Sequence, residues 1–217
     1  MKNLLKIMLT ASLCVSASIA APQKGSMTDP RDGKTYKTVK IGDQVWMAEN
    51  LNYEKPLSYC YGDTHGRDEA ECVKFGRLYK WKYAIIACPA GWHLPSVAEF
   101  ETLFDAVGGK SVAGSQLGSK LEFHNGWGTN YGGADAFGFS AHPFGTRNDG
   151  EDYSHMGLCA FFWSSTADSN SNGARRLQMC YDYYYKRYNA ELNATSKDEG
   201  LSVRCLKDDD SLKGKIK

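Results

Sequence analysis

β-Favouring residues gather on both sides of a Gly–Asp pair near the start of the chain. One run covers residues 34–41 and a second, which includes Trp46, covers 44–47. Gly42 and Asp43 lie between them, and a glycine-containing pair of this kind suits a two-residue turn. The pattern therefore predicts a β-hairpin.

Apolar residues next recur at helical spacing over 76–87, which predicts an amphipathic helix. Its apolar face would comprise Leu78, Trp81, Ala84 and Ile85, and its solvent-facing residues would include Arg77, Lys80 and Lys82.

A second helix is predicted from Val97 onward. Ser96 and Glu99 have the spacing of a capping box, in which each residue satisfies a backbone N–H of the other. Gly108 and Gly109 follow the last apolar position and are typical of a helix end. The apolar positions of this helix are Val97, Phe100, Leu103, Phe104 and Val107.

The remaining segments show weaker patterns. Residues 53–75 are rich in turn-forming and acidic residues and predict a surface loop, which a disulfide between its own cysteines would staple. Residues 109–150 are rich in Gly, Ser and Asn and predict long irregular loops. Scattered apolar residues would attach these loops to the core: Leu117, Leu121, Trp127, Phe137, Phe139 and Phe144. Short strands are expected at 160–164, 175–185 and 201–206.

The first twenty residues have the order of an export signal. Lys2 and Lys6 precede an apolar run, and small residues follow it, so we expect cleavage between Ala20 and Ala21. A retained N-terminal anchor and lipidation at Cys14 are the alternatives, although the residues before Cys14 place the bulky residue wrongly for lipidation.

Size and charge narrow the class of protein. Removing residues 1–20 leaves 197 residues, enough for one large domain, and changes the formal charge from +1 to −1. A nucleic-acid partner is not expected, because phosphate binding requires clustered basic residues. No segment reaches the roughly 20 apolar residues of a transmembrane helix. We expect a short linker at 21–28, one domain at 29–208 and a charged tail at 209–217.

The exported chain keeps an even number of cysteines, which makes disulfides the default interpretation. They are Cys60, Cys72, Cys88, Cys159, Cys180 and Cys205. Six cysteines allow 15 pairings, and the sequence pattern does not choose among them. A structural zinc site is the competing interpretation, but no two cysteines have the close spacing typical of one.

Several strings resemble the Fibrobacter succinogenes major paralogous domain, a family of exported bacterial proteins. They include DGKTYKTVKIGDQVWMAENLNY at 32–53, FGRLYKWKYA at 75–84, CPAGWHLPSVAEFETL at 88–103, FFWSST at 161–166 and GLSVRCLKD at 200–208. The matches occur in order along nearly the whole mature chain.

This resemblance implies an α+β, C-type lectin-like fold. In that fold the first strands pair near the last strand, two helices lie beside small antiparallel sheets, and long loops present a ligand surface. The resemblance also implies the pairs Cys88–Cys205 and Cys60–Cys72, which would leave Cys159 with Cys180.

Candidate ligand residues lie in the C-terminal half. On a strand, Tyr181, Tyr183 and Tyr185 would share one face, with Tyr184 on the other, and tyrosine rings suit contact with sugars or protein partners. Tyr188 extends the run. A core strand is the alternative interpretation.

The polar segments 167–176 and 189–197 add side chains that can hydrogen-bond hydroxyl groups, of which Arg175 and Asn189 are the preferred ones. The others are Asp168, Asn170, Asn172 and Asn193. Ordinary turn chemistry is the alternative.

Calcium binding and an enzymatic activity are two further hypotheses. Calcium is conceivable through oxygen ligands at Asp135, Asn148, Asp149, Glu151 and Asp152, but no regular calcium-loop spacing is present. We expect no cofactor and no other metal.

An oxidative enzyme related to the formylglycine-generating type would need reactive thiols at Cys159 and Cys180, whose surroundings do not match that motif. His93, within CPAGWHLP, is expected to be structural.

The sequence thus predicts a secreted or cell-surface, non-catalytic binding or adhesion module. Its expected partner is a polysaccharide or a surface protein. A structural component of the cell envelope without a small ligand is the second hypothesis.

Overall fold

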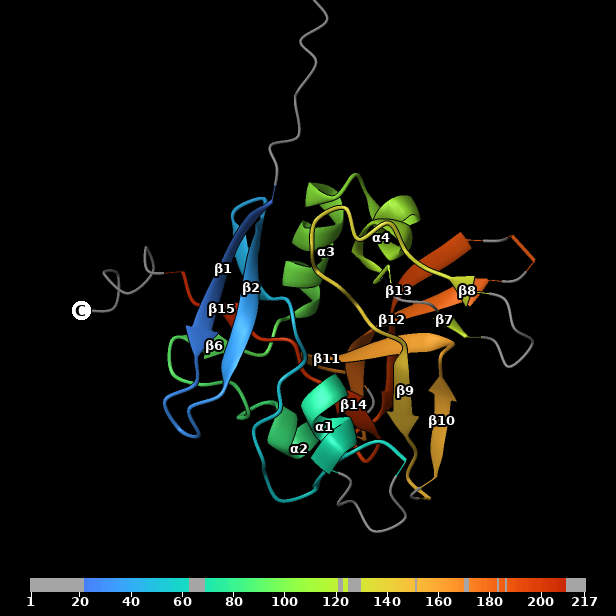
Figure 1. Ribbon diagram of the computed structural model, residues 1–217. Helices are drawn as coiled ribbons and strands as arrows, with labels where there is room; N and C mark the ends of the chain where they lie inside the picture. The colour runs from blue at the N-terminus through green and yellow to red at the C-terminus, as the bar shows by residue number, and fades with distance from the viewer. Residues whose placement is uncertain are drawn as a thin grey trace, which may run out of the picture.

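A computed structural model describes residues 22–62, 69–120, 123–124, 130–150, 152–169, 172–182, 184–185 and 187–209. The predicted signal peptide, its cleavage site at Ala20 and Ala21, and Cys14 lie outside this range, as do residues 210–217 of the tail. The described chain is α+β, with sheet predominating. Figure 1 shows the helices at 97–106 and 110–117 in the upper part of the view and those at 69–75 and 81–84 in the lower part.

The first sheet joins the two ends of the domain. Its strand order is β1-β2-β3-β15-β6. The strands are β1 (Gln23–Thr28), β2 (Thr35–Ile41), β3 (Gln44–Met47), β15 (Leu206–Lys207) and β6 (Trp92–His93). The predicted hairpin is confirmed: Ile41 pairs with Gln44, and Gly42 takes the positive φ of 58° that the turn requires.

The predicted linker at 21–28 is wrong for residues 23–28, because β1 pairs antiparallel with β2 along its whole length. The residues of β1 are mostly exposed, so they show no alternation of apolar and polar positions that would predict a strand. Its stability comes from backbone pairing with β2.

The second sheet follows the order β10-β9-β14-β11-β12-β13, with β5 paired to β14 and β4 paired to β5. In chain order these are β4 (Ser58–Tyr59), β5 (Leu78–Lys80), β9 (Phe144–Arg147), β10 (Tyr153–Met156), β11 (Cys159–Ala167), β12 (Gly173–Asp182), β13 (Arg187–Ser196) and β14 (Gly200–Ser202). Only β11 and β14 run parallel among the described pairs of this sheet. A separate ladder joins β7 (Phe123–His124) to β8 (Asn130–Tyr131).

Four helices accompany the described strands: α1 (Glu69–Phe75), α2 (Trp81–Ala84), α3 (Val97–Ala106) and α4 (Lys110–Leu117). The second predicted helix is confirmed as α3, with both hydrogen bonds of the Ser96–Glu99 capping box present. None of the helices in the described ranges is long and apolar enough to cross a membrane.

The helix predicted over 76–87 is largely wrong. Leu78 and Tyr79 form strand β5, and only one helical turn, α2, follows. Arg77, expected in solvent, is 2% exposed and donates to the Glu69 carboxylate at 2.6 Å. The loop predicted at 53–75 is also wrong at its end, where α1 forms. In both cases tertiary pairing overrides the local pattern.

The expectation of irregular loops over 109–150 is wrong at 110–117, which is α4. A Cβ on Gly114 would lie 2.6 Å from the carbonyl oxygen of Tyr188, so glycine lets this helix approach β13 closely.

β13 itself occupies most of the segment expected as a polar loop at 189–197. Its buried positions include the small residue Ala190, which conceals the strand pattern.

Two clusters of buried residues form the core. In the first, Trp46 stacks on Phe100 of α3 at 5.4 Å and meets the edge of Phe139 at 5.7 Å. In the second, the indole N–H of Trp163 donates to the Tyr79 carbonyl, and the Tyr79 hydroxyl donates to the carbonyl of Tyr53. The aromatic rings therefore link the two sheets while their polar atoms stay hydrogen-bonded.

A fully buried arginine lies between these clusters. The guanidinium of Arg204 donates to the Asn50 side chain, to the carbonyls of Met47 and Phe139, and to the carbonyl of Ser140. Burial lowers the pKa of Arg204 to about 9, which leaves it cationic at neutral pH. Several backbone segments thus share one buried charge.

Three disulfides close the fold: Cys60–Cys72, Cys88–Cys205 and Cys159–Cys180. The first two are the pairs implied by the family resemblance, and the third is the pair that these two leave. Disulfides of this number fit a chain that folds in an oxidising compartment.

The disulfides should differ in their contribution to stability. The two cysteines of Cys88–Cys205 are 117 positions apart in the sequence, whereas those of Cys60–Cys72 are 12 positions apart. The chain-entropy relation predicts that replacing both cysteines by serine costs about 5 kcal/mol for the first pair and about 3 kcal/mol for the second. Urea unfolding of the two double variants without reductant measures this, and equal or reversed costs would contradict the expectation.

Gly76 offers a second test, with Gly33 as its matched control. Both have positive φ, +78° and +74°, but an added Cβ would lie 2.6 Å from Asn50 Cβ only at Gly76. Gly33→Ala should lower the free energy of unfolding by about 1 kcal/mol, and Gly76→Ala by at least about twice that. Urea unfolding measures both, and similar losses would show that Asn50 moves freely.

Candidate functional site

The long hairpin β12–β13 ends in a turn that carries Tyr184 and Tyr185. Ten residue pairs run from Gly173↔Ser196 to Asp182↔Arg187. Beyond the last pair, the Asp182 carboxylate accepts the backbone N–H groups of Tyr184 at 2.9 Å and Tyr185 at 3.0 Å. Such an Asx contact replaces hydrogen bonds that the turn would otherwise lack.

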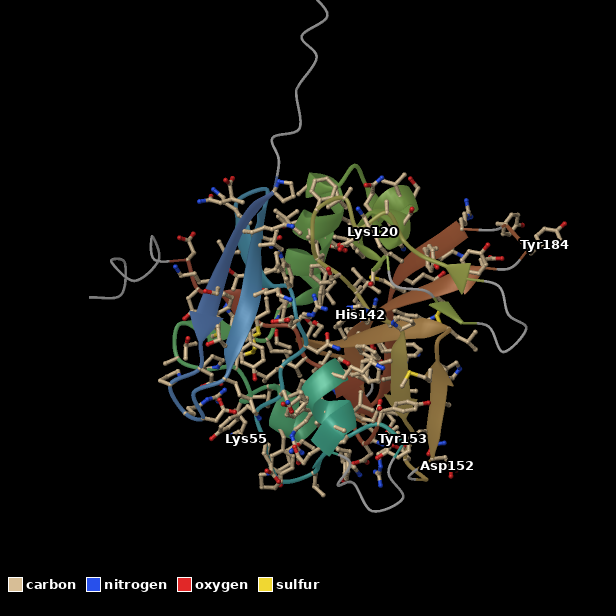
Figure 2. All side chains as sticks on the ribbon, in the orientation of Figure 1. Lys55, Lys120, His142, Asp152, Tyr153 and Tyr184 are labelled. Atoms are coloured by element: carbon tan, nitrogen blue, oxygen red, sulfur yellow. A yellow bond between two sulfur atoms is a disulfide. The ribbon has the colours of Figure 1, made fainter. Side chains whose placement is uncertain are left out.

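The two tyrosines at this turn are the most exposed aromatic residues in the described chain. Tyr184 is 85% exposed and Tyr185 62%, and their rings meet edge to face at 4.8 Å. The Arg187 guanidinium lies 5.0 Å from the Tyr185 ring centre. Figure 2 shows Tyr184 at the outer end of the hairpin, pointing away from the body of the molecule. We call Asp182, Tyr184, Tyr185 and Arg187 the tyrosine tip.

The predicted tyrosines are not gathered on one strand face. β12 ends at Asp182, so Tyr185 belongs to the turn, and Tyr183 lies outside the described residues. Tyr181 is half-buried and contacts Tyr188 edge to face at 5.0 Å. Tyr188 is only 5% exposed. The prediction of strand alternation through residue 185 is therefore wrong, because the chain reverses there.

The two polar residues preferred as ligand contacts bind the hairpin itself. Arg175 donates to the Leu192 carbonyl at 2.7 Å, and Asn189 donates to the Asp182 carboxylate at 3.2 Å. Asn193 likewise accepts from Arg176 at 3.0 Å. These contacts hold β12 against β13 and so support the tip. Asn170 lies outside the described residues.

Two of the residues considered for calcium, Asp135 and Asn148, accept hydrogen bonds from nearby residues. The Asp135 carboxylate accepts the backbone N–H and the hydroxyl of Ser140, and the Asn148 side chain accepts the Asp152 N–H. Glu151 lies outside the described residues. One cluster with metal-ligand geometry joins Cys60, Glu69 and Cys72, but its two sulfur atoms are bonded to each other.

The two cysteines considered for thiol chemistry are also bonded to each other. Cys159 and Cys180 are paired across β11 and β12 in a disulfide, and Cys159 is 7% exposed. A disulfide sulfur is not the thiolate that nucleophilic chemistry uses.

His93 lies between two carboxylates. Its Nε2 lies 2.9 Å from the Glu99 carboxylate and its Nδ1 lies 2.7 Å from that of Asp208. The hydrogen bond to Glu99 outweighs burial and, with the one to Asp208, raises the pKa of His93 to about 9. Burial alone would raise the pKa of Glu99, but hydrogen bonds from His93 and Ser96 lower it to about 2. His93 is thus a cation that joins α3 to Asp208, the residue that follows β15.

A further concavity was not predicted from the sequence. It has a volume of about 330 Å³ and lies between β2, the end of α1 and residues 142–144. Its side chains come from segments far apart in the chain, so no local spacing marks it. The one local feature in the sequence is that His142 and Phe144 lie two positions apart within the glycine-rich segment 109–150.

A family model for the Fibrobacter succinogenes major domain matches residues 39–207. This range covers well over half of the chain, so the chain belongs to that family, as the quoted strings indicated. Neither the curated proteins nor the solved structures contain a significant match.

The His93 group predicts a defined pH dependence of stability. Because its folded pKa is raised above 6.5, its contribution is complete below about pH 6.5 and declines as the pH rises through 9. The depressed pKa of Glu99 makes its contribution complete above 4.5, with a decline as the pH falls toward 2. Urea unfolding should therefore show a loss between pH 6.5 and 9.5 that His93→Gln removes.

His155→Gln provides the matched control, because His155 is exposed and its side chain meets Ser154 and Phe161 rather than a carboxylate in the described residues. This variant should keep the alkaline loss. The same loss in His93→Gln would show that other groups cause it.

Proposed function

We propose that this member of the Fibrobacter succinogenes major domain family is an exported, non-catalytic binding or adhesion module. It has a lectin-like fold and engages a polysaccharide or a surface protein through the tyrosine tip. The observation that carries the proposal is the exposure of two adjacent tyrosine rings on a hairpin whose Arg175 and Asn189 side chains hydrogen-bond within the protein.

The chemistry of the tip suits a polymer or protein surface. Aromatic rings left in solvent forgo the burial that normally stabilises them, and they offer flat apolar faces together with hydroxyl groups. The contacts of Asp182 fix the turn, so little conformational freedom is lost when a partner binds. Arg187 adds a donor beside the rings.

The covalent framework supports action outside the cytoplasm. Three disulfides stabilise the described domain in an oxidising environment, and the residues before it have the sequence pattern of an export signal. This combination supports a secreted or cell-surface location.

The tip predicts a specific loss of binding. Joint replacement Tyr184→Ser and Tyr185→Ser should weaken retention on a polysaccharide ligand about tenfold or more, because each ring can supply on the order of 1 kcal/mol or more. The measurement is affinity electrophoresis and pull-down of the full mature chain with amorphous cellulose and with xylan, followed by a pull-down with cell-surface protein extract. The thermal midpoint should change little, since both side chains are exposed.

Tyr83→Ser is the matched control, because Tyr83 is a half-buried tyrosine on α2 and not part of the tip. It should leave retention unchanged. Equal retention by the wild type and the double tip variant would overturn the site. Absence of retention on every polymer and extract would favour a structural envelope component, whereas titratable thiol at Cys159 or Cys180 would favour the oxidative enzyme.

A further inference from the structure

The concavity beside α1 has a rigid polar floor. We call it the His142 groove and define it by Glu49, Asn50, Asn52, Phe75, His142 and Phe144. Asn50 accepts from Arg204 at 2.8 Å and donates to the Phe75 carbonyl at 2.9 Å. Gly76 lies so close to Asn50 that a Cβ would not fit between them. The floor is therefore fixed before any ligand arrives.

Aromatic rings form one wall of the groove. The ring centres of Phe75 and Phe144 are 3.9 Å apart, and His142 stacks on Phe144 at 5.2 Å. Burial, followed by the nearby charge of Arg204, lowers the pKa of His142 to about 4. The imidazole is thus neutral at physiological pH and offers one donor and one acceptor nitrogen. Figure 2 places His142 centrally, between the β1–β2 strands and β9.

The side-chain oxygen of Asn52 is a hydrogen-bond acceptor without a donor among the described residues. Its backbone N–H donates to the Tyr36 hydroxyl at 3.0 Å, and its carbonyl accepts from Lys34 at 2.6 Å. Its side-chain oxygen, in a residue that is only 7% exposed, has no hydrogen-bond partner among the described residues. Buried polar atoms are nearly always paired, so this oxygen lacks a donor that a ligand can provide.

The charged side chains around the groove already have partners. The Glu49 carboxylate accepts the backbone N–H of Lys37 and lies 3.3 Å from its ammonium group. Lys34 pairs with Asp32 at 3.3 Å, and Lys74 lies over the Phe75 ring at 4.4 Å. A charged ligand would have to displace one of these partners, whereas a neutral ligand would not.

We propose that the His142 groove binds one neutral sugar ring, either as a free sugar or as a unit of a polysaccharide chain. The apolar face of the ring lies against Phe75 and Phe144. Its hydroxyl groups donate to Asn52 and exchange hydrogen bonds with His142. The volume of about 330 Å³ suits a ligand of this size. This site is separate from the tyrosine tip and rests on the proposed function only for the class of ligand.

The test is an NMR titration of the ¹⁵N-labelled mature chain with free glucose, free xylose, cellotetraose and xylotetraose. Glycerol serves as a probe that has hydroxyl groups but no ring face. Saturable shifts are expected at the backbone amides of 50–52, 75–76 and 142 with at least one sugar and not with glycerol. Shifts with the tetrasaccharides alone identify a chain unit as the ligand, and shifts with the free sugars identify a single sugar.

His142→Ala and Asn52→Leu should each weaken the apparent affinity about tenfold. His155→Ala, an exposed histidine outside the groove, is the matched control and should bind as the wild type does. If Asn52→Leu does not fold, His142→Ala decides the result. No saturable shift with any sugar, or shifts that both folded variants retain, would overturn the proposal.

The double tyrosine variant separates the two sites. It should lose retention on polymers and keep the sugar-dependent shifts of the groove. Loss of both effects in that variant would assign the groove shifts to the tip and overturn the groove proposal. Retention on polymers without any groove shift would leave the tip function intact and remove only the groove.

Discussion

The structure depends above all on the need to satisfy the buried guanidinium of Arg204. A buried cation is costly unless its donors find acceptors, and here the acceptors come from two stretches far apart in the chain, residues 47–50 and residues 139–140. Arg204 also lies over the rings of Phe139 and Phe162. The neighbouring residues extend this arrangement, because Val203 and Cys205 accept the backbone N–H groups of Leu51 and Met47. A short stretch near the C-terminus therefore sets the path of the N-terminal half.

This constraint explains why the two proposed binding surfaces differ in character. The His142 groove lies directly beside the Arg204 network, since Asn50 belongs to both, and its geometry is inherited from the core. The tyrosine tip lies at the far end of a ten-pair ladder, where the Asp182 carboxylate accepts the backbone N–H groups of Tyr184 and Tyr185. The groove is thus suited to a small rigid ligand, and the tip to a broad and variable surface. A module with both could contact a polymer at one point while holding a single unit of it at another.

The sequence predicted what depends on neighbouring residues and missed what depends on distant ones. The hairpin at 35–47 and the capped helix α3 were predictable because turn and cap chemistry act over two or three residues. β5 was mistaken for helix because its pairing with β14 links residues more than a hundred positions apart. α4 was missed because Gly114, which weakens the helical pattern, is needed for contact with Tyr188. Tyr184 and Tyr185 lay within the predicted tyrosine run, but their exposure could not be inferred, since it follows from where β12 stops. The groove brings together side chains from positions 49 to 144, and only the folded chain does so.

The Cys88–Cys205 bond has a consequence for survival of the protein in its surroundings. It makes residues 88–205 a closed covalent ring that contains most of the second sheet, both α3 and α4, and the tyrosine tip. A protease that cuts this ring once, for example in the exposed turn at Tyr184 and Tyr185, opens the ring without releasing a fragment. The two pieces stay joined through sulfur and through the β12–β13 ladder, which the Cys159–Cys180 bond ties to β11. Damage at the most exposed point would then disable one contact surface while the domain remains whole.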